Sequence, residues 1–459
     1  MNSVSDAHQT STSPLESPLQ LKGIGGKPVF VDFDGAQISS DGGLLLLREV
    51  EEQTGIITAF EEVINDSRHP SYVKHEVSTL LRQRIGQIAC GYEDANDSNE
   101  LRSDPIFKMF ADRLPENDPD LGSQPTHSRF ENSISRTTLY RIAEAFVKVF
   151  IRSYESQPEV IVLDFDDTED VVHGGQQLAL FNAFFGEYCF MPLHVYEGIS
   201  GKLLTTILRP GQRMNGKQVV MILKRLLALL REAWPNTIII FRGDGHFSSP
   251  EALAYCDAQP NVHIVVGLGG NQRLQKAVRT TVQSAKKLYK QHERKVTLFH
   301  SFHYKADTWH RQFRVVSKVE YSEKGLNTRF IVTDLLHAKT QALYREIYCA
   351  RGKAELFIKD HKRHLQSDRT SCTRFEANQF RLLLHSAAYV LLHTMRAQVL
   401  RKPDWKKATF RTIQLKVLKI GTRVRELKTR IKVEFPSSYP DKPALTQSFK
   451  LLEALRFQT

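Results

Sequence analysis

A short stretch of this sequence places one carboxylate among several cations. Residues 348–362 read YCARGKAELFIKDHK, which contains no proline and predicts a helix. At about 100° per residue, five polar side chains fall within an arc of roughly 80°: Tyr348, Arg351, Glu355, Lys359 and Lys362. Neighbouring charges on a solvated helix face are usually of both signs. The stripe is therefore either an ordinary exposed face or a metal ligand surrounded by groups that bind phosphate.

Carboxylates also end two apolar segments that predict buried strands. The first segment, VIVLDF, contains Asp164 and leads into Asp166, Asp167 and Asp170. The second segment, TIIIF, is followed by Asp244. In an open α/β sheet the ligand site lies beyond the strand ends. We therefore expect acids from both segments to face one crevice.

Acids that share a crevice repel one another unless a cation lies between them. Mg²⁺ prefers carboxylate oxygens and keeps several waters for a substrate. Together with Glu355, Asp166 and Asp244 would supply three carboxylates from distant parts of the chain, enough for two metal ions about 4 Å apart. Asp also often caps helices or forms turns, and for Asp170 we favour that structural role.

The elements that must position these residues change in character along the chain. Amphipathic helices such as His75–Cys90 dominate the first 155 residues, and strands alternating with helices then predict an α/β core with a central sheet. A basic helix, Asn271–Glu293, precedes three β-rich runs. We divide the chain into a disordered leader (1–26), a mainly helical N-terminal domain (27–155), the first part of the core (156–270), a β-rich insertion (271–340), a helix with the rest of the core (341–400) and a basic C-terminal region (401–459).

The charge balance indicates a polyanionic partner. The net charge is +12, and Arg401–Lys432 contains twelve Lys or Arg residues against two acids. Such a segment is typical of a phosphate-binding arm, or of a surface used for solubility. The five cysteines form no C-x-x-C pair, which excludes a zinc site of that type and fits a reducing cytosol. No apolar run predicts a membrane span or a signal peptide.

The acids and the stripe together resemble DDE transposases of bacterial insertion sequences. Tyr348, Arg351, Glu355 and Lys362 match the Tyr-x2-Arg-x3-Glu-x6-Lys signature of one branch of that family. Its first acid lies in an Asp-x-Thr context, as Asp166 does before Thr168, and its second acid precedes a Phe, as Asp244 precedes Phe247. The resemblance runs from about Phe30 to the basic C-terminal region.

The resemblance implies an RNase H-like α/β core with a mixed central sheet, interrupted by a β-rich insertion and preceded by a helical DNA-binding domain. Asp166, Asp244 and Glu355 would be catalytic and would ligate two Mg²⁺ ions, or Mn²⁺, with Asp164 as the alternative first ligand. The expected reaction is cleavage of the DNA ends at inverted repeats, through a hairpin, and joining to target DNA. The expected partners are double-stranded DNA and a second copy of the chain, in the bacterial cytoplasm near the nucleoid.

DNA-binding residues are expected in several places. The resemblance assigns terminal phosphates to the cations and phenol of the stripe: Tyr348, Arg351, Lys359 and Lys362. Trp309 would either stack on a displaced base or pack in the protein. Arg82, Arg84 and Lys74 of the helical domain are candidates for reading the ends, and Arg401–Lys432 is a candidate for gripping the backbone.

Two alternatives remain open at this point. Asp164 and Asp166 also fit the Asp-x-Asp-x-Thr motif of haloacid-dehalogenase-like phosphatases, with Asp164 as nucleophile and Asp166 as general acid/base. That family's late acidic motif usually contains a further acid, whereas none follows Asp244 before Glu251. The second alternative is a DNA-binding protein that has lost activity, although all three acids of the triad are present.

Overall fold

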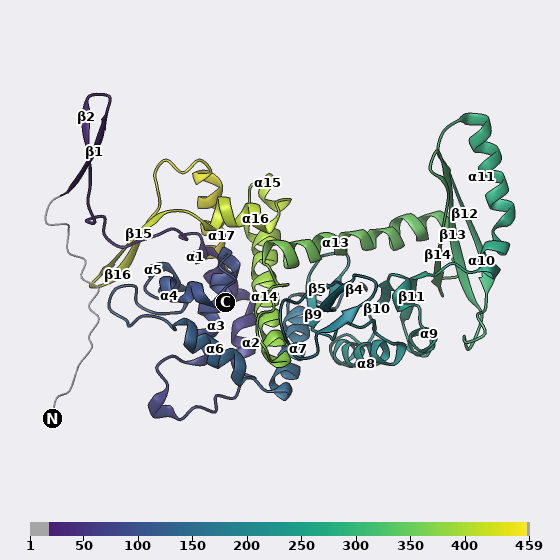
Figure 1. Ribbon diagram of the computed structural model, residues 1–459, viewed down its shortest axis with the longest axis horizontal. Coiled ribbons are helices and arrows are strands. Elements are labelled where there is room, and N and C mark those ends of the chain that lie inside the picture. The colour runs from purple at the N-terminus through teal and green to yellow at the C-terminus, as the bar shows by residue number, and fades with distance from the viewer. Residues whose placement is uncertain (1–17, 457–459) are drawn as a thin grey trace.

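The N-terminal residues of the described chain form a hairpin. The computed structural model describes residues 18–456, so residues 1–17 of the expected disordered leader lie outside it. Residues 18–26 differ from that expectation, because β1 (Leu19–Ile24) pairs antiparallel with β2 (Lys27–Val31). Leu19 faces Val31 and Leu21 faces Val29, and such apolar cross-strand pairs favour a strand pair. The hairpin projects from the rest of the molecule (Figure 1).

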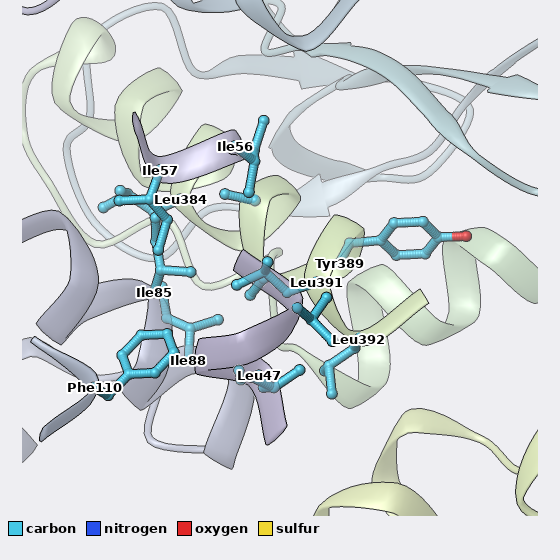
Figure 2. Close-up of a cluster of buried hydrophobic side chains, with 14 of the residues drawn as sticks. Leu47, Ile56, Ile57, Ile85, Ile88, Phe110, Leu384, Tyr389, Leu391 and Leu392 are labelled. Atoms are coloured by element: carbon cyan, nitrogen blue, oxygen red, sulfur yellow. The ribbon is translucent and has the colours of Figure 1, made fainter. Parts of the chain in front are cut away.

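A helical body follows the hairpin. Its helices are α1 (Leu44–Thr54), α2 (Ile56–Glu61), η1 (Pro70–Tyr72), α3 (Val77–Cys90), η2 (Ala95–Asp97), α4 (Ser98–Leu101), α5 (Pro105–Phe110), α6 (Gln124–Ser133) and α7 (Arg136–Arg152). The long apolar helix α14 (Phe375–Thr394) runs through this body, with most of its residues buried. Figure 2 shows Leu384, Leu391 and Leu392 of α14 in one apolar cluster with side chains of α1, α2, α3 and α5. The N-terminal helices therefore share a core with a helix 220 positions or more further along the chain.

The basic C-terminal region belongs to the same body. It contains η7 (Met395–Val399), α15 (Pro403–Lys406), α16 (Phe410–Ile413), η8 (Gln414–Leu418), β15 (Thr422–Leu427), β16 (Arg430–Glu434) and α17 (Lys442–Arg456), and β15 pairs with β3 (Ile38–Ser39). Trp405, Phe410 and Val424 lie in the same apolar core as α14. A Cβ on Gly43 would meet the Val417 carbonyl oxygen at 1.9 Å, which shows how closely the start of α1 packs against η8. The region is thus a packed part of the body, and phosphate binding by its cations stays a prediction.

An eight-stranded mixed sheet forms the second body. Its order is β12-β13-β14-β11-β10-β4-β8-β9. The strands are β4 (Val160–Asp167), β8 (Leu193–Glu197), β9 (Leu203–Ile207), β10 (Ile238–Gly243), β11 (Val262–Leu268), β12 (Val296–Tyr304), β13 (Phe313–Ser322) and β14 (Gly325–Thr333). β4, β10 and β11 are parallel neighbours, whereas β8 is antiparallel to both β4 and β9. The five strands from β9 to β11 have the mixed arrangement expected of an RNase H-like core.

The expected β-rich insertion continues this sheet. β14 pairs antiparallel with β11, with Val265 opposite Thr333, so β12, β13 and β14 extend the core at its β11 edge. The three strands are antiparallel to one another, and strand patterns alone do not reveal that they pair with the edge of the core sheet. A small separate sheet contains β5 (Asp170–Val171), β7 (Glu187–Phe190) and β6 (Leu180–Asn182).

The two faces of the large sheet carry different elements. One face packs against α8 (Gly216–Ala233), α9 (Pro250–Asp257), α10 (Gln272–Ala277) and α11 (Arg279–His292). The other face is crossed by a helical run made of α12 (Thr340–Ala342), η4 (Leu343–Tyr348), η5 (Cys349–Arg351), α13 (Gly352–Lys359) and η6 (Asp360–His364). This run leads from the extended end of the sheet back to α14 (Figure 1). No helix in residues 18–456 is long and apolar enough to cross a membrane.

One buried carboxyl in the helical body makes stability sensitive to pH. Glu51 of α1 is almost fully buried and accepts hydrogen bonds from the backbone N–H groups of Ile57 and Thr58 at 2.9 and 3.2 Å. Burial raises the pKa of Glu51 from 4.5 to about 7, although these hydrogen bonds oppose the rise. Because the folded-state pKa is raised, the stability that the protonated group contributes is complete below about pH 4.5 and is lost as the pH rises through 7.

Glu51→Gln should remove this dependence. Between pH 5 and pH 8 the free energy of unfolding of the unmodified protein should fall by up to about 3 kcal/mol more than that of the variant. Urea unfolding at the two pH values measures the difference. Glu61→Gln, which changes an exposed acid of α2, should behave like the unmodified protein, and equal pH dependence in all three proteins would contradict the assignment.

Candidate active site

Two acids meet because their strands are parallel neighbours. In the register of β4 and β10, Asp164 lies opposite Arg242 and Phe165 opposite Gly243. Asp166, next to the last residue of β4, and Asp244, directly after β10, therefore lie at the same end of adjacent strands, as expected from the sequence. The side chain of Asp244 accepts a hydrogen bond from the His246 N–H at 2.9 Å and caps the turn η3 (Gly245–Phe247). This cap fixes the Asp244 carboxylate at the strand end.

The helical run brings the third acid towards them. Nη1 of Arg351 lies 3.0 Å from Oδ2 of Asp166, and its Nη2 lies 3.7 Å from Oε1 of Glu355. The guanidinium therefore stands between the two carboxylates. The run is less regular than the single helix that the sequence predicts, because η4 and η6 are π-helical and η5 is a 3-10 turn. Departures of this kind inside helices often lie at functional sites.

Burial and like charges dominate the electrostatics of the crevice. The pKa of Asp166 is raised to about 7, first by burial, with Arg351 opposing the rise and Asp244, Asp167 and Glu355 adding to it. Burial also raises the pKa of Tyr348, whose phenol interacts with Arg351 and Asp244. Asp166 thus lies in a partly dehydrated space in which three other carboxylates disfavour its charged form and the Arg351 guanidinium favours it.

Asp164 is held in a different environment from Asp166. Both of its carboxylate oxygens accept hydrogen bonds from Arg242, from Nε at 2.5 Å and from Nη2 at 2.6 Å, and the carboxylate is fully buried. Arg242 also donates to the Ile347 carbonyl oxygen at 2.5 Å. The pair therefore ties the sheet to the start of the helical run, while Asp166 faces Arg351.

The remaining residues of the stripe lie in three different settings. Lys362 donates to the Glu169 carbonyl oxygen and lies 3.2 Å from the Glu169 carboxylate and 3.7 Å from the buried Asp170 carboxylate. Lys359 is exposed. Tyr348 lies beside β11, since a Cβ on Gly267 would come within 2.9 Å of its hydroxyl. Of the stripe, only Arg351 and Glu355 form ion pairs with each other or with Asp166 in the described chain.

Other residues singled out in the sequence lie outside the crevice. Trp309 is buried and packs edge-on against Tyr304 and Phe313, at 5.4 and 5.6 Å between ring centroids. Arg84 is fully buried beside Glu131 at 3.3 Å, so it is not available to DNA. Arg82 pairs with Asp112 at 3.1 Å and is mostly buried, whereas Lys74 is exposed. Helix α3 is covered on nearly all sides, which its sequence periodicity did not reveal.

Sequence reasoning missed a second group of charges beside the crevice. Arg209 lies 3.6 Å and His246 3.9 Å from the carboxylate of Asp167. Burial raises the pKa of Asp167 to about 6, with Arg209 opposing the rise and the Asp244 charge adding to it. Oδ2 of Asp167 has no hydrogen-bond partner in the described chain. Arg209 follows β9 in an unremarkable loop, LRPGQR, and no local signal points to it.

The donor chemistry of the crevice fits a divalent cation. Asp166 and Asp167 are carboxylates whose pKa values are raised, and one of their oxygens is buried without a hydrogen-bond partner. Acids that are buried and close together favour a cation with oxygen ligands, in addition to Arg351 beside Asp166 and Arg209 beside Asp167. As the side chains stand, no three His, Cys, Asp or Glu residues in 18–456 are close enough together to hold a metal ion. The Arg351 guanidinium supplies the positive charge between Asp166 and Glu355 instead.

Comparison with known proteins relates the chain to a protein family and to solved structures. The family model described as Transposase DDE domain group 1 matches residues 21–457. A search of curated proteins finds no match. Among solved structures, a cryo-EM structure of a piggyBac transposase synaptic complex with hairpin DNA is similar at a TM-score of 0.45 and 12% identity, over 83% of this chain and 80% of that chain.

Replacing each strand acid separately should distinguish their roles. Asp164→Asn leaves the buried Arg242 guanidinium without its carboxylate, and the free energy of unfolding should fall by about 3 kcal/mol or more. Asp166→Asn removes an acid that burial already disfavours, so the loss should stay below about 1 kcal/mol. Guanidinium chloride unfolding at pH 7 measures both, and equal losses would contradict the structural role of Asp164.

Proposed function

This chain belongs to the family described as Transposase DDE domain group 1, and from that premise we propose that it cuts and joins DNA. Its substrate would be the inverted repeats that end an insertion sequence of the Tyr-Arg-Glu-Lys branch. Cleavage would pass through a hairpin before the ends are joined to target DNA. The observation that carries the proposal is the pair Asp166 and Asp244 at neighbouring parallel strand ends, with Glu355 brought near by Arg351.

In this proposal Asp166, Asp244 and Glu355 hold two Mg²⁺ ions, or Mn²⁺. Bound ions of this kind activate an attacking oxygen and stabilise the leaving oxygen of a phosphodiester. Arg351 would release Asp166 and turn its guanidinium to a DNA phosphate, which it can bind through two N–H groups. Lys362 would keep the segment after Asp166 in place through Glu169. Tyr348 and the exposed Lys359 would contact the DNA backbone.

The proposed partners and the proposed cellular location follow from the same function. Double-stranded DNA would be the substrate and the target, and two copies of the chain would act on two ends in one complex. All five cysteines are free thiols, which accords with a reducing cytoplasm, where the protein would work at the nucleoid.

The phosphatase alternative is not favoured by the geometry. A nucleophilic Asp164 would need a carboxylate oxygen facing the substrate. Both of its oxygens instead accept hydrogen bonds from Arg242 inside the protein, and its side chain has no exposure. The alternative also gives no role to Arg351 or Glu355.

Asp244→Ala tests the assignment of the second acid. The variant should lose strand cleavage by at least about 10³-fold, because charge stabilisation at the reacting phosphate is lost. It should still bind the same DNA, which separates catalysis from binding. Cleavage of a duplex carrying the sequences that flank the gene, scored on a denaturing gel, is the measurement. The matched control is Asp307→Ala, which removes an exposed acid that is distant from Asp244 in the sequence. Undiminished cleavage by Asp244→Ala would sink the metal-site assignment.

Arg351→Gln tests whether the guanidinium competes with the cation. Removing a positive charge that lies 3.0 Å from Asp166 should tighten Mn²⁺ binding to the DNA-free protein by about tenfold. Isothermal titration calorimetry measures the affinity, and the shift in Tm with Mn²⁺ is a second readout. Lys353→Gln, an exposed position two residues away in the chain, should leave the affinity unchanged. Weaker Mn²⁺ binding by Arg351→Gln would mean that Arg351 does not occupy the cation's place.

A further inference from the structure

A second basic segment lies far from the C-terminal one. Residues 258–306 contain nine Lys or Arg residues and a single acid, Glu293, so the segment has a net charge of +8. Because acids elsewhere in the chain offset this positive charge, the net charge of the whole chain does not reveal it. Surfaces used only for solubility normally intersperse both signs. The charge therefore needs its own explanation.

The structure concentrates these cations on two helices. α10 and α11 bury Leu274, Val278 and Ala285 against the sheet. Six exposed cations of the segment are Lys276, Arg279, Lys286, Lys287, Lys290 and Arg294, and we call them the α10–α11 surface. At about 100° per residue, Arg279, Lys286 and Lys290 lie within an arc of roughly 40° and form a row about 16 Å long.

These cations are not neutralised within the described chain. Arg273 pairs with Asp307 at 2.8 Å, and Lys295 pairs with Glu320 at 2.9 Å. None of the six residues of the α10–α11 surface forms an ion pair with another residue in 18–456. Like charges four residues apart, such as Lys286 and Lys290, destabilise a helix. A polyanion laid along the row would remove that cost.

The surface lies on the face of the sheet opposite the candidate active site. Successive side chains of a strand point to opposite faces. In β13, Val315 and Val319 pack in the core that contains α10 and α11, whereas Val316 packs with Leu343 and Tyr344 of the helical run. Figure 1 shows α11 at the outer end of the molecule, beyond β12 to β14. DNA bound along α11 would therefore be separated from Asp166 by the sheet itself.

We propose that the α10–α11 surface binds the backbone of duplex DNA at a segment other than the one held between the carboxylates. The inference rests on the proposed function, because that function makes DNA the partner. Lys and Arg side chains along a helix contact phosphates without reading bases. A row of about 16 Å spans about five base pairs. The surface thus extends the DNA-binding footprint around the edge of the extended sheet.

Charge reversal of the row tests the proposal. In Arg279→Glu, Lys286→Glu and Lys290→Glu combined, affinity for a duplex of about 40 base pairs at 0.1 M salt should fall by about tenfold or more. In the milder pair Lys286→Gln and Lys290→Gln, the slope of log affinity against log salt should become shallower by about 2. The matched control is Lys217→Gln with Lys224→Gln on exposed positions of α8, whose slope should not change. All these positions are exposed, so the substitutions should leave the fold intact. Circular dichroism checks that each variant is folded. An unchanged slope in the α11 pair would overturn the proposal.

The location is tested by crosslinking. Lys286 and Lys359 are replaced in turn by a photo-crosslinking amino acid, and the crosslinked nucleotides are mapped on the duplex that carries the flanking sequences. Position 286 should crosslink nucleotides at least about one helical turn from those reached by position 359. The same nucleotides at both positions, or none at 286, would contradict a separate segment. Failure of the proposed function would give a different result from failure of this proposal. If the proposed function were wrong, the unmodified protein itself would not cleave the duplex or would not bind DNA at all.

Discussion

The fold brings several carboxylates close together, and the structure depends on positively charged groups that offset their repulsion. Parallel β4 and β10 place Asp166 and Asp244 side by side, and burial makes their mutual repulsion stronger than it would be in water. The guanidinium of Arg351 lies 3.0 Å from Asp166 and offsets part of this repulsion. The Asp164–Arg242 pair beneath holds the start of the helical run in place through the Ile347 carbonyl. The buried Asp164–Arg242 pair therefore positions the residues that surround a second, less buried pair, Asp166–Arg351.

The helical run connects two bodies with separate cores. Its first turns pack on the sheet through Leu343 and Tyr344, and its last residues reach the core of the helical body through α14. The Asp360 carboxylate pairs with Arg396 at 2.6 Å, at the far end of α14. The N-terminal helices and the C-terminal region share this core, and the helical run joins it to the sheet that carries Asp166.

The sequence predicted what depends on local pattern. The apolar runs that became β4 and β10 and the acids at their ends were recognisable, since burial on both faces requires continuous apolar residues. Tertiary contacts decided the rest. Asp164 and Asp166 are two residues apart and share a face of the strand, so the alternation of side chains could not distinguish their roles. Only the position of Arg242 distinguishes them. The pairing of β14 with β11, the burial of Arg84 and Trp309, and the packing of the C-terminal region likewise depend on residues distant in the chain.

The central claim is that a divalent cation replaces the Arg351 guanidinium among these acids. Crystals of the protein with Mn²⁺ and a duplex carrying the flanking sequences would test it most directly, through anomalous scattering from manganese. The account predicts a peak in contact with the carboxylates of Asp166 and Asp244, with Glu355 turned towards it and Arg351 moved away from Asp166. A manganese peak elsewhere, with Arg351 still paired to Asp166, would contradict it.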